Sequence, residues 1–247
     1  MIDNYNVYRF SLYENIRYIL EGFVVVLILG ALFYRSILGI IILSPLVYLY
    51  FKKKNKDLIE KRKWQLNIEF RDGINSLSAA IGAGISVEHA FLEAIKDLKR
   101  MYPDGAMIIK EFTYLVNQIQ MNITVEKALY DFGDRSHVED IVSFAEVFST
   151  AKRTGGDIIQ IIKTTGSIIS NRLEVKREIR TVIAAKRFEA TIMKIVPAGI
   201  LCYLTITSPG FLDPLYHNVL GILVMTILII IYLITYRIID NIISIEL

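Results

Sequence analysis

The chain has a single cysteine and three histidines among its 247 residues. Cys202 therefore has no partner within the chain for a disulfide, and no thiolate set for zinc can form. The histidines, His89, His137 and His217, are far apart, and none belongs to the His-Glu-x-x-His spacing that places two zinc ligands on one helix face. His89 beside Glu88 is more typical of a polar helix surface than of a ligand set. The sequence predicts no metal site.

Motifs for enzymatic chemistry are also missing. The glycine-rich stretch Thr154-Gly155-Gly156-Asp157 precedes a helix, as phosphate-binding loops do, but it lacks the Gly-x-x-x-x-Gly-Lys-Ser/Thr frame and a lysine directly after the glycines. No Gly-x-Ser-x-Gly motif occurs. The net charge is only +3, from 28 basic and 25 acidic residues, which does not favour nucleic-acid binding. We expect a protein that is not an enzyme and that needs no cofactor and no nucleic acid.

Hydrophobic residues make up 53% of the chain, more than in an ordinary soluble domain, and they concentrate near its two ends. The run Ile19–Phe51 is long enough for two short helices that turn around Tyr34-Arg35-Ser36, and the first of them can begin before Ile19. Two further apolar runs, Ile192–Ser208 and Val219–Tyr236, are separated by a cluster of Pro, Gly and Asp. The sequence predicts a polytopic membrane protein with two transmembrane hairpins.

The placement of basic residues predicts the orientation of these hairpins. The segment between the two last apolar runs has no Lys or Arg, and the first turn has only Arg35. A basic cluster directly follows the first hairpin, which by the positive-inside rule puts both termini and the middle of the chain in the cytosol. The cluster is expected to contact anionic membrane lipids, although it can also form a solvated helix face. Its members are Lys52, Lys53, Lys54, Lys56, Lys61, Arg62 and Lys63.

The middle of the chain has apolar residues at three-and-four spacing throughout, which is typical of helices. The fold expected is all-α, with the two transmembrane hairpins flanking a cytosolic six-helix bundle. The layout is an N-terminal segment at 1–18, hairpins at 19–51 and 191–236, a helical domain at 52–190 and a tail at 237–247. The six predicted helices are Gln65–Ala83, Val87–Met101, Gly105–Met121, Val125–Phe132, Val138–Arg153 and Ile158–Glu189.

The breaks between these helices carry the residues that stop and start helices. Glycine or asparagine ends a helix, and a hydroxyl or carboxylate residue begins the next. Gly133 is predicted to end the fourth helix. The stretch 84–93 is similar to 122–131, which indicates either a duplicated helix hairpin or two ordinary capped helices. Residues at these breaks are candidates for partner contact or for structural turns: Gly84, Ser86, Glu88, Thr124, Glu126, Arg153, Gly155, Gly156 and Asp157.

Two of these breaks resemble a known family. Ala83-Gly84-Ile85-Ser86, followed by an acid and Ala90, and Ala151-Lys152-Arg153-Thr154-Gly155-Gly156-Asp157 at the head of a long charged helix are similar to the type II secretion system F-domain. The hairpin–domain–hairpin order resembles the TadB-like members from tight-adherence (Tad) pilus assembly. This resemblance implies a platform protein in the cytoplasmic (inner) membrane. Its implied partners are a hexameric secretion ATPase, a sister F-domain platform protein and the prepilin or pilin.

The chain departs from the wider family in one respect. Many members of that family carry two F-domains, whereas this chain has one, so a functional unit is expected to form a homo- or hetero-oligomer. Two other functions remain open on the sequence alone. One is the permease subunit of an ATP-driven transporter, although such subunits generally have more membrane spans. The other is a membrane-anchored sensor or scaffold.

Overall fold

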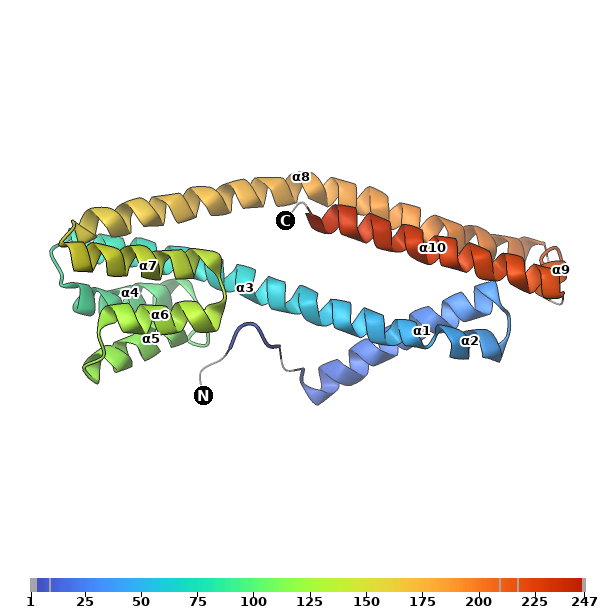
Figure 1. The fold of residues 1–247 in the computed structure, drawn as a ribbon, viewed down its shortest axis with the longest axis horizontal. Coiled ribbons are helices and arrows are strands. Elements are labelled where there is room, and N and C mark those ends of the chain that lie inside the picture. The colour runs from blue at the N-terminus through green and yellow to red at the C-terminus, as the bar shows by residue number, and fades with distance from the viewer. Residues whose placement is uncertain (1–3, 9, 209, 217, 246–247) are drawn as a thin grey trace. The chain divides into compact units, whose positions relative to one another are not determined.

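The computed structural model describes residues 4–8, 10–208, 210–216 and 218–245, and every regular element in these ranges is a helix. The chain divides into two compact units (Figure 1). Unit 1 comprises Met1–Arg9 and Asn55–Glu174, and unit 2 comprises Phe10–Lys54 and Val175–Leu247. Two helices, α3 (Pro45–Gly82) and α8 (Ile158–Thr207), contribute residues to both units.

Unit 1 consists of helices packed around one hydrophobic core. Between the unit's portions of α3 and α8 lie α4 (Val87–Met101), α5 (Met107–Gln120), α6 (Val125–Ser136) and α7 (Glu139–Thr154), and each of these four packs against the next (Figure 1). Its core is rich in phenylalanine. The ring of Phe70 lies edge-on to the rings of both Phe132 and Phe144, and the ring of Phe91 lies edge-on to that of Phe112. The quadrupoles of aromatic rings favour this arrangement.

The first helical turns of α8 complete this core through one narrow stripe. Ile162, Ile169 and Leu173 are buried at three-and-four spacing. Gly166 lies on the same stripe, and a Cβ atom there would come within 3.0 Å of Ile74 on α3. Because glycine removes that atom, α8 and α3 can approach closely at this point.

The bounds of the helices between α3 and α8 agree with the sequence prediction more closely than the bounds of α3 and α8 themselves. The prediction for α4 is confirmed at both ends. The prediction that Gly133 ends the fourth helix is wrong, because α6 continues to Ser136 and the left-handed residue is His137, with φ 49°. The predicted boundaries at Gln65 and Glu189 are also wrong, since α3 begins at Pro45 and α8 continues to Thr207.

Unit 2 contains α1 (Leu12–Phe33), α2 (Ile37–Leu43), α9 (Asp213–Tyr216) and α10 (Val219–Ile245). Three helices in the described ranges, α1, α8 and α10, are long and apolar enough to cross a membrane. The predicted turn after the first arm is confirmed, with Arg35 in a left-handed conformation at φ 45°. The second predicted arm is interrupted at Ser44, so its apolar residues divide between α2 and the start of α3. The protein is therefore an all-helical membrane protein, while the four-pass layout stays a prediction.

Specific contacts hold the apolar helices of unit 2 together. Gly22 on α1 lies against Val47, to which an added Cβ would be 3.2 Å away. The turn after α1 is tied to the break after α8 by an ion pair of 3.1 Å between Arg35 and Asp213. On α10, Thr226 accepts a hydrogen bond of 3.1 Å from the Tyr34 hydroxyl. The last two of these contacts join the first apolar stretch to the last one.

Candidate partner-contact surface

The corner between α7 and α8 shows how the predicted turn residues work. Gly155 takes the left-handed conformation at φ 69°, and the Gly156 N–H donates to the carbonyl of Ala151 at 3.0 Å. This pattern satisfies a carbonyl at the end of α7 that has no partner within the helix. Asp157 then begins α8, because its Oδ1 accepts a hydrogen bond of 3.0 Å from the N–H of Gln160. Both the predicted stop and the predicted start are confirmed.

The corners after α3 and α5 repeat this backbone pattern. The left-handed residue is Gly84 in one, at φ 89°, and Asn122 in the other, at φ 64°. In each corner the next N–H donates to a carbonyl five residues earlier, at 3.2 Å from Ile85 and 3.0 Å from Ile123. Three helices of unit 1 thus end in the same motif, which also accounts for the similarity between the stretches at 84–93 and 122–131.

The hydroxyl residues at these two corners stand where the sequence places them but do not form the expected cap. Ser86 and Thr124 precede α4 and α6, yet neither side chain caps a backbone N–H of its helix. The Ser86 hydroxyl lies 3.0 Å from Nδ1 of His89 instead. The position of both caps is confirmed, and their expected bond is not.

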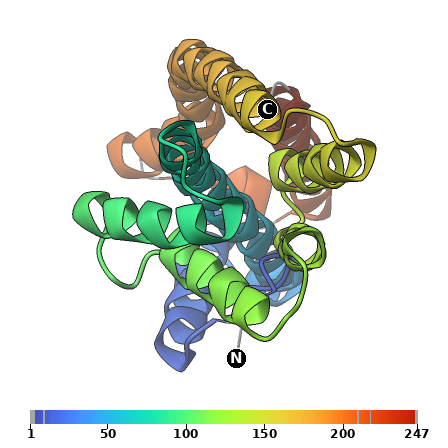
Figure 2. The ribbon, with the colours of Figure 1, turned by 90° about the vertical axis from the view of Figure 1, so that its left-hand side faces the viewer.

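All nine candidate residues lie at the same end of unit 1. The turns after α3, α5 and α7 lie at the end that is leftmost in Figure 1 and faces the viewer in Figure 2. An ion pair of 3.2 Å connects Glu126, at the start of α6, with Lys152, which directly precedes the turn after α7. We call this surface the corner face, and it consists of residues 84–88, 122–126 and 153–157.

The corner face mixes charged and apolar side chains. Glu88 and Arg153 are exposed, and so are the neighbouring apolar side chains of Met121 (75%) and Ile159 (49%). Burial raises the pKa of Glu126, but its own backbone N–H and the Lys152 ammonium outweigh this effect, so the pKa is lower than usual. Such a mixed, mostly exposed surface suits contact with another protein better than chemistry on a small substrate.

The predicted basic cluster divides between the two units, and part of it contacts the chain itself. In unit 2, Lys53 pairs with Asp240, and the Lys54 ammonium lies 5.2 Å from the ring centre of Tyr18. In unit 1, the Arg62 guanidinium stacks 4.7 Å from the ring centre of Tyr5, and Lys63 donates to Asn6 at 2.9 Å. Four members are exposed, namely Lys52, Lys53, Lys56 and Lys61.

Sequence reasoning missed a buried ionic network that joins α5 and α6. The Arg135 guanidinium binds both oxygens of Glu111, at 3.0 and 2.8 Å, and also Asp131 at 2.9 Å. The Tyr5 hydroxyl donates to Glu111 at 2.9 Å, and the Tyr5 N–H donates to the Arg135 carbonyl at 3.0 Å. Burial alone would lower the pKa of Arg135, but its bonds with Glu111 raise it, so the guanidinium stays charged. One signal was available, because Glu111 occupies an apolar position between Ile108 and Leu115.

A second missed network ties α8 to the bundle. Asp140 on α7 is buried, and its two oxygens accept hydrogen bonds of 2.7 Å from Asn67 on α3 and 2.7 Å from Arg172 on α8. Arg172 is next to Leu173, the last residue of the buried stripe of α8, and anchors the helix at that end of the stripe. Both networks are structural, since each charged group in them already has a partner of opposite sign.

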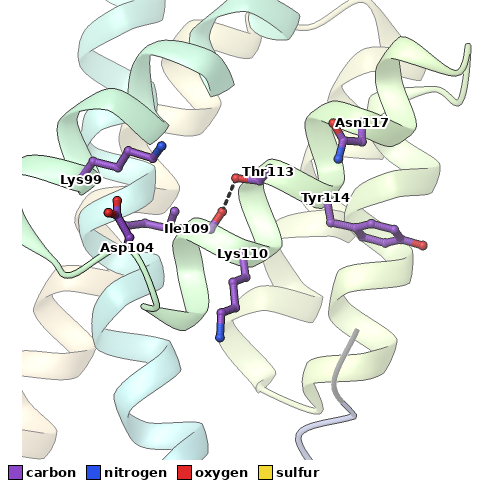
Figure 3. A pocket seen from close by; sticks show the side chains of 7 residues that line it. All are labelled: Lys99, Asp104, Ile109, Lys110, Thr113, Tyr114 and Asn117. Atoms are coloured by element: carbon purple, nitrogen blue, oxygen red, sulfur yellow. Dashed lines mark hydrogen bonds between the residues drawn. The ribbon is translucent and has the colours of Figure 1, made fainter. Parts of the chain in front are cut away.

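A shallow open depression of about 430 Å³ lies on α4 and α5 (Figure 3). The Thr113 hydroxyl on its floor donates to the Ile109 carbonyl at 2.6 Å, so it is already used within the helix. No group of three metal-ligating side chains occurs within the described part of the chain, and His217 lies outside that part. The side chains around the depression are Lys99, Asp104, Ile109, Lys110, Thr113, Tyr114 and Asn117.

Comparison of the chain with known protein families, with curated proteins and with solved structures finds no match.

Proposed function

We propose that this protein is a platform protein of a type IV-like (Tad) pilus or type II secretion machine in the cytoplasmic membrane. In this role it couples a hexameric secretion ATPase in the cytosol to the insertion of pilin into a filament. It works in an oligomer with copies of itself or with a sister F-domain protein. The similarity of its two glycine-containing corners to the F-domain family supports this role.

The observation that carries the proposal is the corner face. Residues that the sequence singled out from three separate breaks, spanning 84 to 157, lie at one end of a single bundle (Figure 2). That end presents exposed charged and apolar side chains. A platform needs such a surface, because the ATPase must grip a protein that also enters the membrane.

The helices α3 and α8 also support the proposal, because they connect unit 1 to the apolar unit 2. Each contributes residues both to the bundle and to the apolar unit, so the two units are connected through continuous helical backbone. A force applied to unit 1 can then reach the membrane segments through helices instead of flexible linkers. In this proposal unit 1 lies in the cytosol, as the basic cluster next to the first apolar region favours.

Co-purification from the native cell tests the proposal. The full chain, tagged and solubilised in mild detergent, should retain a secretion ATPase and a prepilin that mass spectrometry identifies. Reversing two exposed charges of the corner face, in the double variant Glu88→Lys/Arg153→Glu, should reduce ATPase recovery at least fivefold. The matched control is Lys99→Glu/Asp104→Lys at the depression on α4 and α5, which likewise reverses two exposed charges and leaves the net charge unchanged. If neither a secretion ATPase nor a pilin co-purifies, and the chain instead supports ATP-dependent transport of a solute, the protein is the permease subunit of a transporter.

A further inference from the structure

Two lysines from different helices converge on one carboxylate in unit 2. Lys53 on α3 and Lys194 on α8 both pair with Asp240 on α10. Both ammonium groups also lie over the ring of Tyr236, at 5.6 Å for Lys53 and 4.4 Å for Lys194. The neighbouring Tyr232 hydroxyl donates to the Lys194 carbonyl at 2.7 Å, which fixes α10 against α8 beside the cluster.

This cluster stands where apolar sequence gives way to charged sequence on all three helices. Lys53 follows the apolar start of α3, Lys194 precedes the apolar end of α8, and Asp240 lies near the end of the apolar stretch of α10. In a membrane, such a border coincides with the level of the lipid phosphates. The Lys194 side chain is only 14% exposed, so its ammonium is held between helices at this level.

The charges in the cluster do not balance. Two ammonium groups face one carboxylate, which leaves an excess of one positive charge in a partly enclosed place. Each ammonium has three donors, and in the described residues only one of them is used by an acceptor, Asp240. Four donors therefore remain on two ammonium groups that meet at the same carboxylate. An anionic oxygen group would complete both the charge and the hydrogen bonds.

We infer that Lys53 and Lys194 form a discrete binding site for the phosphate of an anionic phospholipid. A lipid fits better than a soluble anion for two reasons. The site borders the apolar stretches of three helices, where acyl chains would lie, and it stands at the depth where lipid phosphates are already concentrated. Tyr232 and Tyr236 add the aromatic rings that are typical of this level of a membrane.

Native mass spectrometry of the full chain in detergent tests the site with phosphatidylglycerol as the probe and phosphatidylcholine as the neutral comparison. The unaltered chain should retain one phosphatidylglycerol more tightly than any phosphatidylcholine. The double variant Lys53→Gln/Lys194→Gln should bind it about thirtyfold more weakly, since each lysine that contacts the lipid phosphate is expected to contribute about fivefold. The matched control, Lys52→Gln/Lys56→Gln, removes the same charge from two lysines of the same basic cluster that do not converge on Asp240, and should change retention in detergent less than twofold.

The variant Asp240→Asn tests the same site without removing a lysine, so it remains informative if the double lysine variant does not fold. Asp240→Asn retains both lysines and removes the competing carboxylate, so it should bind phosphatidylglycerol about fivefold more tightly. Equal loss in the test and control variants, or no gain in Asp240→Asn, would refute a discrete site. Displacement of the lipid by an equal concentration of glycerol phosphate would show a soluble-anion site instead. The inference depends on the chain lying in a membrane and not on the proposed ATPase, so either can fail alone.

Discussion

The two glycines between α7 and α8 have different roles, although they are adjacent. Gly155 has φ 69°, where a Cβ costs about 1 kcal/mol or more. Gly156 has an ordinary φ, and a Cβ there would meet its nearest neighbour at 3.6 Å. We expect Gly155→Ala to destabilise unit 1 by about 1 kcal/mol and Gly156→Ala to stay within about 0.5 kcal/mol of the unaltered chain. Denaturant unfolding followed by the single tryptophan, Trp64, measures both, and equal effects would contradict this division.

The buried ion pair between Glu111 and Arg135 predicts that replacing Arg135 lowers the stability of unit 1 much more than replacing the exposed Arg153. Arg135→Met leaves the Glu111 carboxylate, only 2% exposed, without its guanidinium. Leaving such a charge unpaired costs about 3–5 kcal/mol, which we expect as the loss in unfolding free energy. Arg153→Met, the same change at an exposed position of the corner face, should cost less than about 0.5 kcal/mol. A comparable loss in both variants would mean that the network does not stabilise unit 1.

The ion pair between Glu126 and Lys152 predicts a small dependence of stability on pH. Glu126 has a folded pKa below its ordinary value of 4.5, so its contribution is complete above that pH and is lost as the pH falls through the lowered pKa. Lys152→Met should therefore reduce stability at pH 7 by about 0.2–1 kcal/mol, as expected for a surface pair. The difference from the unaltered chain should disappear in acid, below the folded pKa. A difference that persists there would exclude the ion pair as its cause.

At the scale of elements, the contact between α8 and α3 depends on a residue that has no side chain. In Gly166→Val the new Cβ would lie 3.0 Å from Ile74, and overpacking of this kind costs about 1–3 kcal/mol. Gly199 lies on the same helix with nothing within 4 Å of an added Cβ, so Gly199→Ala should cost nothing. Unfolding followed by Trp64 fluorescence compares them. Equal stability of the two variants would show that α8 is not seated on α3 at Gly166.

A helix end can be predicted from the sequence where the residues that end the helix are its immediate neighbours in the chain. Both ends of α4 are marked by turn residues, Gly84 on one side and Pro103 on the other, and both bounds are confirmed. Gly133 carries the same stop signal but serves another purpose. A Cβ there would lie 3.4 Å from the backbone of Val142, so the glycine permits close packing of α6 on α7. Sequence alone does not separate these two uses of glycine.

The bounds of α3 and α8 were missed for a different reason. Both predicted limits follow a change in composition, because Gln65 follows the charged stretch 52–63 and Glu189 precedes the apolar run that begins at Ile192. A change between charged and apolar side chains leaves the backbone hydrogen bonds of a helix unaffected, so α3 and α8 continue across it. The partners within the buried networks were beyond prediction as well, because Arg172 and Asp140 are 32 residues apart in the sequence. The candidate residues of the corner face, in contrast, were identified by their turn chemistry.

At the scale of the whole molecule, the proposed orientation predicts which residues are accessible from each side. The chain has one native cysteine, so a Cys202→Ser background allows single cysteines to be labelled. In intact cells a membrane-impermeant maleimide should label Phe211→Cys, an exposed position in the break after α8, and should leave Asp104→Cys unlabelled. Lysis should make both reactive. Labelling of Asp104→Cys in intact cells would overturn the placement of unit 1 in the cytosol.

The docking of Tyr5 also sets an order of events during synthesis. Its hydroxyl and its backbone bind Glu111 and Arg135, which the ribosome adds more than a hundred residues later. At about 5–20 residues per second, Tyr5 waits roughly 6–26 s after its own translation before both of these partners exist. Throughout that interval α1 is already available for insertion into the membrane. Tyr5 is thus among the last residues to reach its place in unit 1, after the helices on which it packs have been made.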